Sequence, residues 1–144
     1  MKKILTALIV ALVVMTSAFA FSFKSAGIEA GKTGTFVVAD FEIIDNLDAY
    51  VRTGYAYSRF NVSAGAQYKV WEFDLGSTPI AVKPGAQVDF YFFNGFLFSG
   101  FVTCQFSYNA GSIEGFVRPG VGINAAKNYV APSWVVEAGA AYLF

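Results

Sequence analysis

The sequence predicts an all-β protein: an eight-stranded, antiparallel, up-and-down transmembrane β-barrel preceded by a cleavable signal peptide. Three observations support this prediction. After residue 20, apolar residues alternate with small or polar residues along most of the chain, which is the two-residue period of a β-strand. Turn-forming residues interrupt this alternation at regular intervals. The 144 residues are 56% apolar and 18% aromatic but only 14% charged, well below the roughly 25% typical of soluble domains.

Residues 1–20 have the three-part organisation of a secretory signal peptide. Two lysines follow Met1, a nearly unbroken apolar run extends from Ile4 to Met15, and the small residues Ala18 and Ala20 occupy the −3 and −1 positions of a cut after Ala20. The apolar run is about a dozen residues long, short of the roughly 20 that span a bilayer. An uncleaved membrane anchor is therefore the weaker alternative. We expect residues 1–20 to be the signal peptide and residues 21–144 to be one outer-membrane β-barrel domain.

Seven turn signals divide residues 21–144 into eight strands. The turn signals lie at residues 31–34, 45–48, 58–61, 76–79, 94–95, 109–112 and 124–132. The strands are predicted at residues 22–30, 35–44, 49–57, 61–74, 80–93, 96–108, 113–123 and 133–144. Strands of about 9–11 residues can cross a bilayer in a barrel, and such barrels have even strand numbers. Eight strands fit this length, whereas twelve would leave almost no residues for turns.

The two faces of these strands differ in a way that favours a membrane barrel. One face is broad and rich in Phe, Tyr, Val and Leu, which suits contact with lipid. The other face carries glycine, serine and charged residues, which suit the inside of a small closed barrel. No second apolar stretch is long enough for a transmembrane helix.

The alternation also predicts which charged side chains point into the lumen. Register predicts that Arg52 lies opposite Asp40 or Glu42, that Arg118 lies opposite Glu137, and that Lys69 faces Lys83. We expect these groups to pair, because unpaired charges would be costly to enclose, and the pairs to fill and hold the lumen. An ion path or a catalytic carboxylate pair is the alternative interpretation. The predicted lumen charges are Glu29, Asp40, Glu42, Arg52, Lys69, Lys83, Asp89, Glu114, Arg118 and Glu137.

The signal peptide, the eight alternating strands and the terminal Ala138-Gly139-Ala140-Ala141-Tyr142-Leu143-Phe144 resemble small bacterial outer-membrane β-barrels of the OmpA/OmpX type. The resemblance covers all of residues 21–144. In that family, a final strand ending in Phe is the signal read by the barrel-assembly machinery. The resemblance implies that Ala138, Ala140, Tyr142 and Phe144 carry this signal here. The chain departs from the family in having almost no long outer loops, which members often use for adhesion or receptor binding.

The resemblance also implies a location and a set of partners. It implies export through the general secretory pathway to the outer membrane of a Gram-negative cell envelope, with outer-membrane lipid around the barrel. Periplasmic chaperones and the barrel-assembly machinery are the partners expected during biogenesis, and we expect a monomer.

Composition excludes several kinds of activity. The chain has no histidine, which removes every histidine-based catalytic arrangement and every histidine metal site. Its single cysteine, Cys104, can form neither an intramolecular disulfide nor a cysteine-rich zinc site. Two of the ten basic residues, Lys2 and Lys3, lie in the signal peptide, so eight remain against ten acidic residues. With no basic patch, nucleic-acid binding is not expected, and we expect no enzymatic activity, no cofactor and no metal.

Three functions are therefore considered. The first is a non-enzymatic outer-membrane β-barrel, porin-like in architecture, with a structural or surface-interaction role in the cell envelope. The second is a narrow channel for ions or small solutes, because inward glycine, alanine and serine fill the lumen poorly. An eight-stranded barrel is, however, only just wide enough for its own side chains. The third is a secreted soluble β-barrel with its faces reversed and an apolar ligand inside.

Two predictions concern the connections. With both termini in the periplasm, the turns near residues 31–34, 58–61, 94–95 and 124–132 face outward, and the last is the only outer loop with room to bind a partner. Asn94-Gly95 is a strong hairpin signal, but the alternation places Phe93 inward and Phe96 outward. We therefore predict a bulge or an odd-length loop there, with Gly95 in the left-handed region.

Overall fold

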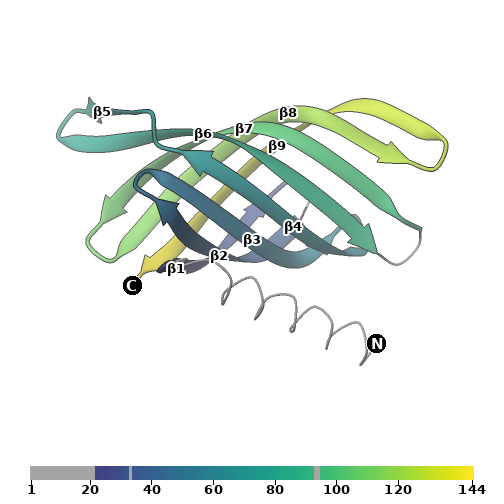
Figure 1. The fold of residues 1–144 in the computed structure, drawn as a ribbon, viewed down its shortest axis with the longest axis horizontal. Helices are drawn as coiled ribbons and strands as arrows, with labels where there is room; N and C mark the ends of the chain where they lie inside the picture. The colour runs from purple at the N-terminus through teal and green to yellow at the C-terminus, as the bar shows by residue number, and fades with distance from the viewer. Residues whose placement is uncertain (1–21, 33, 93–94) are drawn as a thin grey trace.

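The computed structural model describes residues 22–32, 34–92 and 95–144, and all regular secondary structure in these ranges is β-strand (Figure 1). No helix in the described part of the chain has the length and apolarity needed to cross a membrane. In chain order the strands are β1 (Ser22–Gly31), β2 (Gly34–Ile44), β3 (Leu47–Ala56), β4 (Arg59–Tyr68), β5 (Trp71–Leu75), β6 (Thr78–Phe92), β7 (Leu97–Ala110), β8 (Ile113–Ala126) and β9 (Tyr129–Leu143).

Eight of these strands form a closed antiparallel barrel. The strand order is β4-β3-β2-β1-β9-β8-β7-β6-β5, and a further pairing between β4 and β6 closes the ring. Each barrel strand is therefore paired with its neighbours along the chain, and β1 is paired with β9. The prediction of an all-β, eight-stranded antiparallel barrel is confirmed. Strand β5 lies outside the ring, because it pairs only with the first part of β6.

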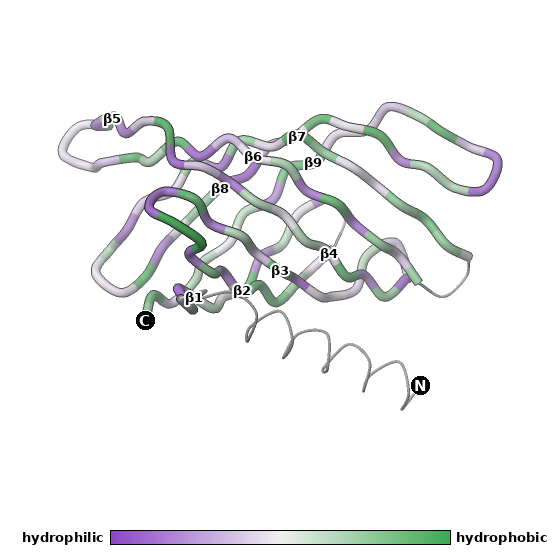
Figure 2. Tube along the Cα trace, in the orientation of Figure 1, coloured by the Kyte–Doolittle hydropathy of each residue, from purple (hydrophilic) through white to green (hydrophobic). Residues whose placement is uncertain are grey.

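The alternation of the sequence places one set of side chains inside the barrel and the other set outside. Along β8 and β9, Glu114, Arg118 and Glu137 are buried, whereas the neighbouring Val117 and Val136 are exposed. Figure 2 shows hydrophobic and hydrophilic positions interleaved along the barrel strands. Among the described residues, 17 polar or charged side chains are buried against nine apolar ones. The interior is thus predominantly polar.

The predicted fourth strand, residues 61–74, is two strands rather than one. β4 ends at Tyr68, and β5 begins at Trp71 after a break at Lys69 and Val70. The register against β6 shifts by one residue across this break: Gln67 pairs with Gly85, but Trp71 pairs with Val82. The resulting β5–β6 hairpin projects beyond the ring at one end (Figure 1).

The turn predicted at residues 124–132 is a plain hairpin connection that is shorter than these bounds. β8 and β9 remain paired up to Ala126 and Tyr129, so only a two-residue turn joins them. The odd-length connection between β6 and β7 is confirmed, since Tyr91 pairs with Leu97 and leaves five residues between them. Gly95 has φ 93°, as predicted. Phe93, Asn94 and the signal-peptide residues 1–20 lie outside the described residues.

The barrel has two chemically different ends. We call the end that holds Ser22, Phe144 and the turns at residues 45–46, 76–77 and 111–112 the terminal end. The opposite end, where β1 connects to β2, β3 to β4, β6 to β7 and β8 to β9, is the distal end. In Figure 1 the C-terminus and the β5–β6 hairpin mark the terminal end, and the β8–β9 hairpin marks the distal end.

Candidate functional site: the charged lumen

Two arginines and three carboxyl groups meet at the centre of the lumen. Arg52 on β3 forms ion pairs with Glu29 on β1 and Glu137 on β9, and its Nη2 lies 3.0 Å from Oδ1 of Asp89 on β6. Arg118 on β8 lies 3.1 Å from Glu29 Oε2 and 3.5 Å from Glu137 Oε2. All five side chains are at most 1% exposed. We call these five residues the central cluster.

Amide side chains complete the bonding of the central cluster. Arg118 donates two hydrogen bonds to Oε1 of Gln105, at 3.0 Å from Nε and 2.8 Å from Nη2. Gln87 donates to Asp89 Oδ1 at 3.0 Å and accepts a bond of 2.8 Å from the Tyr50 hydroxyl. Bonds of this kind reduce the cost of burying charged groups, because they replace hydration that is lost.

Aromatic rings support both guanidinium groups. Arg52 lies over the ring of Phe36 at 4.3 Å, and Arg118 lies over the rings of Tyr50 and Phe116 at 4.1 and 5.0 Å. Such cation–π contacts are stronger where water is excluded. The Tyr50 ring fits because Gly65 lies beneath it: a Cβ on Gly65 would be 2.3 Å from Tyr50 Cζ.

A second group of charges lies closer to the terminal end. Lys24 Nζ is 2.8 and 2.7 Å from the two Asp48 oxygens, and Lys83 Nζ is 3.1 Å from Glu114 Oε1 and 3.7 Å from Asp48 Oδ2. Gln105 donates to Glu114 Oε1 at 3.0 Å and so connects this group to the central cluster. The described part of the lumen therefore contains a bonded charge network that extends from its centre towards one end.

The predicted pairs are partly correct. Arg118 and Glu137 are neighbours in the β8–β9 register, as predicted. The prediction that Arg52 pairs with Asp40 or Glu42 is wrong, because the register places Arg52 beside Val38 and its long side chain reaches carboxyl groups on β1, β6 and β9.

Three other predicted lumen residues lie outside the central cluster. Asp40 accepts a 2.6 Å hydrogen bond from Ser25. Glu42 lines a cavity at the terminal end. Lys69 lines the terminal-end cavity together with Lys83, but it lies in the break after β4, is 37% exposed and pairs with Glu72 at 2.7 Å.

Several residues of the network were missed at the sequence level. Gln87 and Gln105 lie on the inward face of strands whose alternation was recognised, so their positions alone would have identified them. Asp48 was assigned to a turn, although it begins the inward face of β3. Lys24 lies where the β1–β2 register is irregular, between Phe23 and Ser25, and simple alternation does not apply there.

Each end of the lumen opens into a cavity. The cavity at the terminal end has a volume of 280 Å³, and its lining includes Lys24, Glu42, Asp48, Lys83 and Glu114. The cavity at the distal end has a volume of 370 Å³ and is lined by Tyr57, Arg59, Leu97, Asn124, Ala126 and Tyr129. The central cluster lies between these two cavities.

No protein-family model, curated protein or solved structure matches the chain. The eight-stranded antiparallel closed barrel is consistent with an OmpA/OmpX-type barrel. No group of three or more His, Cys, Asp or Glu side chains in the described residues could hold a metal ion.

The residues of the predicted assembly signal lie on and just after the last strand. Ala138, Ala140 and Tyr142 are on the outward face of β9. The Phe144 ring lies 4.9 Å from the Phe23 ring, and the Phe144 N–H donates to the Lys24 carbonyl at 3.0 Å. The role of these residues in assembly stays a prediction.

The central cluster has few free polar atoms with which to act on a substrate. Among the buried side-chain polar atoms of the described residues, Arg52 Nε, Gln67 Oε1 and Glu137 Oε2 have no hydrogen-bond partner. The Glu137 oxygen nevertheless lies 3.5 Å from Arg118. The arrangement is suited to closing the lumen and cross-linking the barrel wall.

Proposed function

We propose that the chain is a non-enzymatic, integral outer-membrane β-barrel protein whose lumen is closed by the central cluster and which has a structural or surface-interaction role in the cell envelope. The observation that carries this proposal is a distribution of side chains opposite to that of a soluble protein, with polar groups inside and apolar groups outside. Charged and amide side chains fill the interior, while large apolar side chains such as Ile28, Val102 and Val121 are 65–67% exposed. Exposed apolar surface on this scale is unusual for a soluble monomer, and it is the pattern of a barrel surrounded by lipid.

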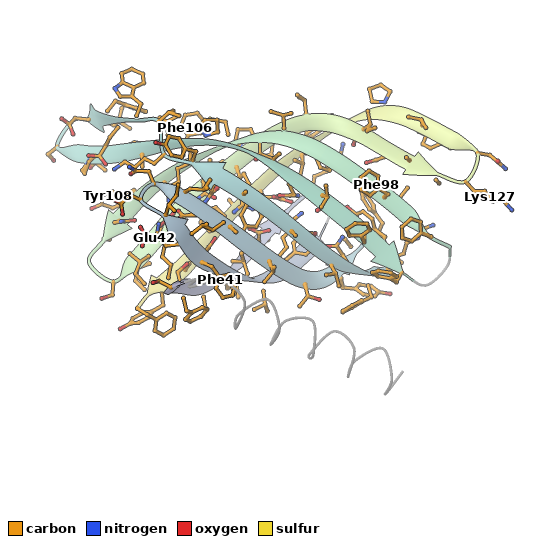
Figure 3. The ribbon with its side chains drawn as sticks, viewed as in Figure 1. Phe41, Glu42, Phe98, Phe106, Tyr108 and Lys127 are labelled. Carbon is orange, nitrogen blue, oxygen red and sulfur yellow. The ribbon has the colours of Figure 1, made fainter. Side chains whose placement is uncertain are left out.

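Aromatic side chains extend this outward surface. Figure 3 shows Phe98, Phe106 and Tyr108 on β7 and Phe41 on β2, on different sides of the barrel. The alternative of a soluble barrel with an apolar interior requires the opposite arrangement, because Asp89 and Arg118 would then be in solvent, whereas they are at most 1% exposed.

The position of the central cluster supports a closed barrel rather than a channel. Five charged side chains from β1, β3, β6, β8 and β9 form ion pairs in the middle of the lumen, and each of them is almost completely buried. An eight-stranded barrel has little interior space beyond that occupied by its own side chains. We expect the wild-type protein to give no discrete current steps in a planar bilayer. Reproducible steps that change on replacement of Arg52 would favour the channel alternative.

Cell fractionation tests the location. The chain, expressed with residues 1–20 in a Gram-negative host, is expected in the outer-membrane fraction, resistant to extraction by carbonate and with gel migration that changes on boiling. Recovery in the soluble periplasmic fraction without detergent would contradict the proposal.

A charge placed on the outward face tests lipid contact directly. Val121→Arg introduces a cation on the outward face of β8, where Val121 is 67% exposed. A lipid-facing cation near the middle of a bilayer costs about 2–4 kcal/mol, so the folded fraction in lipid vesicles should fall markedly. Ser77→Arg, in the turn of the β5–β6 hairpin, is the control and should fold like the wild type. Equal folding of both variants would show that the outward face of β8 is not in contact with lipid.

A further inference from the structure

The two ends of the barrel differ sharply in charge. Apart from the three carboxyl groups of the central cluster, every acidic residue of the chain lies towards the terminal end, and none lies in the distal connections. The distal end instead carries the cations Lys32, Arg59 and Lys127. In Figure 3, Lys127 lies at the tip of the β8–β9 hairpin and Glu42 lies towards the opposite end.

Arg59 differs from the other two arginines in having no carboxyl partner. Arg52 and Arg118 are engaged in the central cluster, and the chain contains no further arginine. Arg59 is half-buried at the start of β4 and lines the distal cavity, yet no ion pair or hydrogen bond joins its side chain to another described residue. By contrast, the three lysines of the terminal cavity are all paired with acids.

Among the described residues, the rest of the distal cavity lining includes three side chains with hydrogen-bond donors and no carboxylate. Asn124 Oδ1 accepts a 2.7 Å bond from Ser99, which leaves the two N–H groups of its amide available. Tyr57 and Tyr129 place phenol groups in the lining. Partial burial, and then the charge of Asp89, raises the pKa of the Tyr57 phenol. The phenol therefore stays protonated and can donate.

The turn that presents Tyr57 is conformationally strained. Tyr57 and Ser58 have φ 51° and 58°, so two consecutive non-glycine residues occupy the left-handed region. A two-residue hairpin turn between the paired residues Ala56 and Arg59 requires such angles, although they are unfavourable for side chains other than glycine, asparagine and aspartate. The Tyr57 ring is held against Tyr91, with ring centroids 6.0 Å apart. Tyr57 and Arg59 thus come from one turn and line the same cavity.

We propose that the distal cavity binds a phosphorylated sugar, with the Arg59 guanidinium holding the phosphate. Arginine binds phosphate through two parallel N–H donors, and none of the described residues that line the cavity is acidic. The volume of 370 Å³ leaves room for one sugar ring, flanked by the two tyrosines and the Asn124 amide. The sugar phosphate could come from solution or from the headgroup of a glycolipid, and the two sources share this chemistry.

The test uses the three arginine side chains as separate reporters. The whole mature barrel, folded in tetraoxyethylene octyl ether micelles that contain neither sugar nor phosphate, is labelled with ¹⁵N-arginine and titrated with glucose 1-phosphate, inorganic phosphate and glucose. We expect a saturable shift of the Arg59 Nε–H signal with glucose 1-phosphate, a weaker response to inorganic phosphate and none to glucose. The Arg52 and Arg118 signals should not move.

Variants and a lipid probe complete the test. Arg59→Gln should weaken glucose 1-phosphate binding at least tenfold by calorimetry, Arg59→Lys should weaken it less, and Lys69→Gln at the opposite end should leave it unchanged. An unmoved Arg59 signal, or full affinity in Arg59→Gln, would overturn the proposal. Equal affinity for inorganic phosphate would overturn the sugar assignment. Tighter binding of a phosphorylated glycolipid than of the free sugar phosphate would identify the headgroup as the source, and the reverse order would identify the soluble compound. Binding in micelles does not depend on where the protein resides in the cell, so these outcomes are separate from those of the fractionation experiment.

Discussion

Replacement of Arg52 by methionine is the most direct test of the central cluster. Methionine is similar in length and has no charge, so Arg52→Met removes ion pairs to Glu29, Asp89 and Glu137 with little change in volume. Arg118 still contacts Glu29 and Glu137, but the ion pair of Asp89 is with Arg52 alone, so Asp89 is left without a cation. Removing one partner from a buried ion pair costs about 3–5 kcal/mol.

A loss of this size is a large fraction of the 5–15 kcal/mol by which proteins are typically stable. We therefore expect the free energy of unfolding to fall by about 3–5 kcal/mol in Arg52→Met. The assay is reversible urea unfolding in lipid vesicles, followed by the fluorescence of Trp71 and Trp134 and by the gel migration of unboiled samples. Lys69→Met is the control: Lys69 and Glu72 form an exposed pair, and exposed pairs contribute about 0.2–1 kcal/mol.

A double-mutant cycle separates the electrostatic effect from general disruption. Glu137→Gln removes one carboxylate, so Arg52→Met combined with Glu137→Gln restores the original net charge of the central cluster. The combined loss should be clearly smaller than the sum of the two single losses, because contacting residues are energetically coupled. If Arg52→Met fails to fold, Arg52→Lys preserves the charge and should fold with a smaller loss. A loss below about 1 kcal/mol in Arg52→Met, or strictly additive losses in the cycle, would refute the reasoning.

Three further predictions follow from individual positions. Gly65→Ala should displace the Tyr50 ring, because the new Cβ would be 2.3 Å from it, and should lower the unfolding free energy by about 1–3 kcal/mol. Gly115→Ala is the matched control in the same urea titration, because a Cβ at this position would have no atom within 4 Å. Ser58→Gly should raise the unfolding free energy by about 0.5–1 kcal/mol, because glycine tolerates the φ of 58° at this position, and an unchanged urea midpoint would argue against strain in this turn. Deletion of Phe144 should lower the amount of assembled protein in cell membranes several-fold while barrel refolded in detergent keeps most of its stability; equal loss in both settings would assign Phe144 a packing role alone.

The fold could be predicted because its signals are local. Two-residue alternation and turn residues set the strands and decide which side chains face inward, and the structure follows this pattern except where the register shifts, near Lys24 in β1 and between Glu42 and Ile44 in β2. Local signals fail where pairing changes without a change in composition. At Lys69 and Val70 the alternation continues through a break in the strand. Pro132, a typical turn residue, lies within β9. The last pair between β1 and β9 is Gly31 with Glu137, so Pro132 lies on the part of β9 that has no partner in β1. Proline is tolerated at such an edge.

The partners of Arg52 could not be predicted in the same way. Hairpin register identifies only the residues beside a side chain on adjacent strands, and for Arg52 these are Val38 and Ser63. Its carboxyl partners lie on strands that are not adjacent to β3, and a long guanidinium side chain reaches them across the lumen. The pair Arg118 and Glu137 was predictable because both residues belong to one hairpin.

The central cluster also has a consequence for the order of events in folding. Two of its ion pairs join residues far apart in the chain, with separations of 85 residues for Arg52 and Glu137 and 89 for Glu29 and Arg118. These two pairs connect β3 to β9 and β1 to β8, so they form only when β1 meets β9. Until that moment the central cluster is incompletely paired, and an open sheet that entered hydrocarbon early would carry buried charges without all of their partners. Closure of the ring and burial of these charges are therefore one cooperative event, which disfavours half-inserted forms of the barrel.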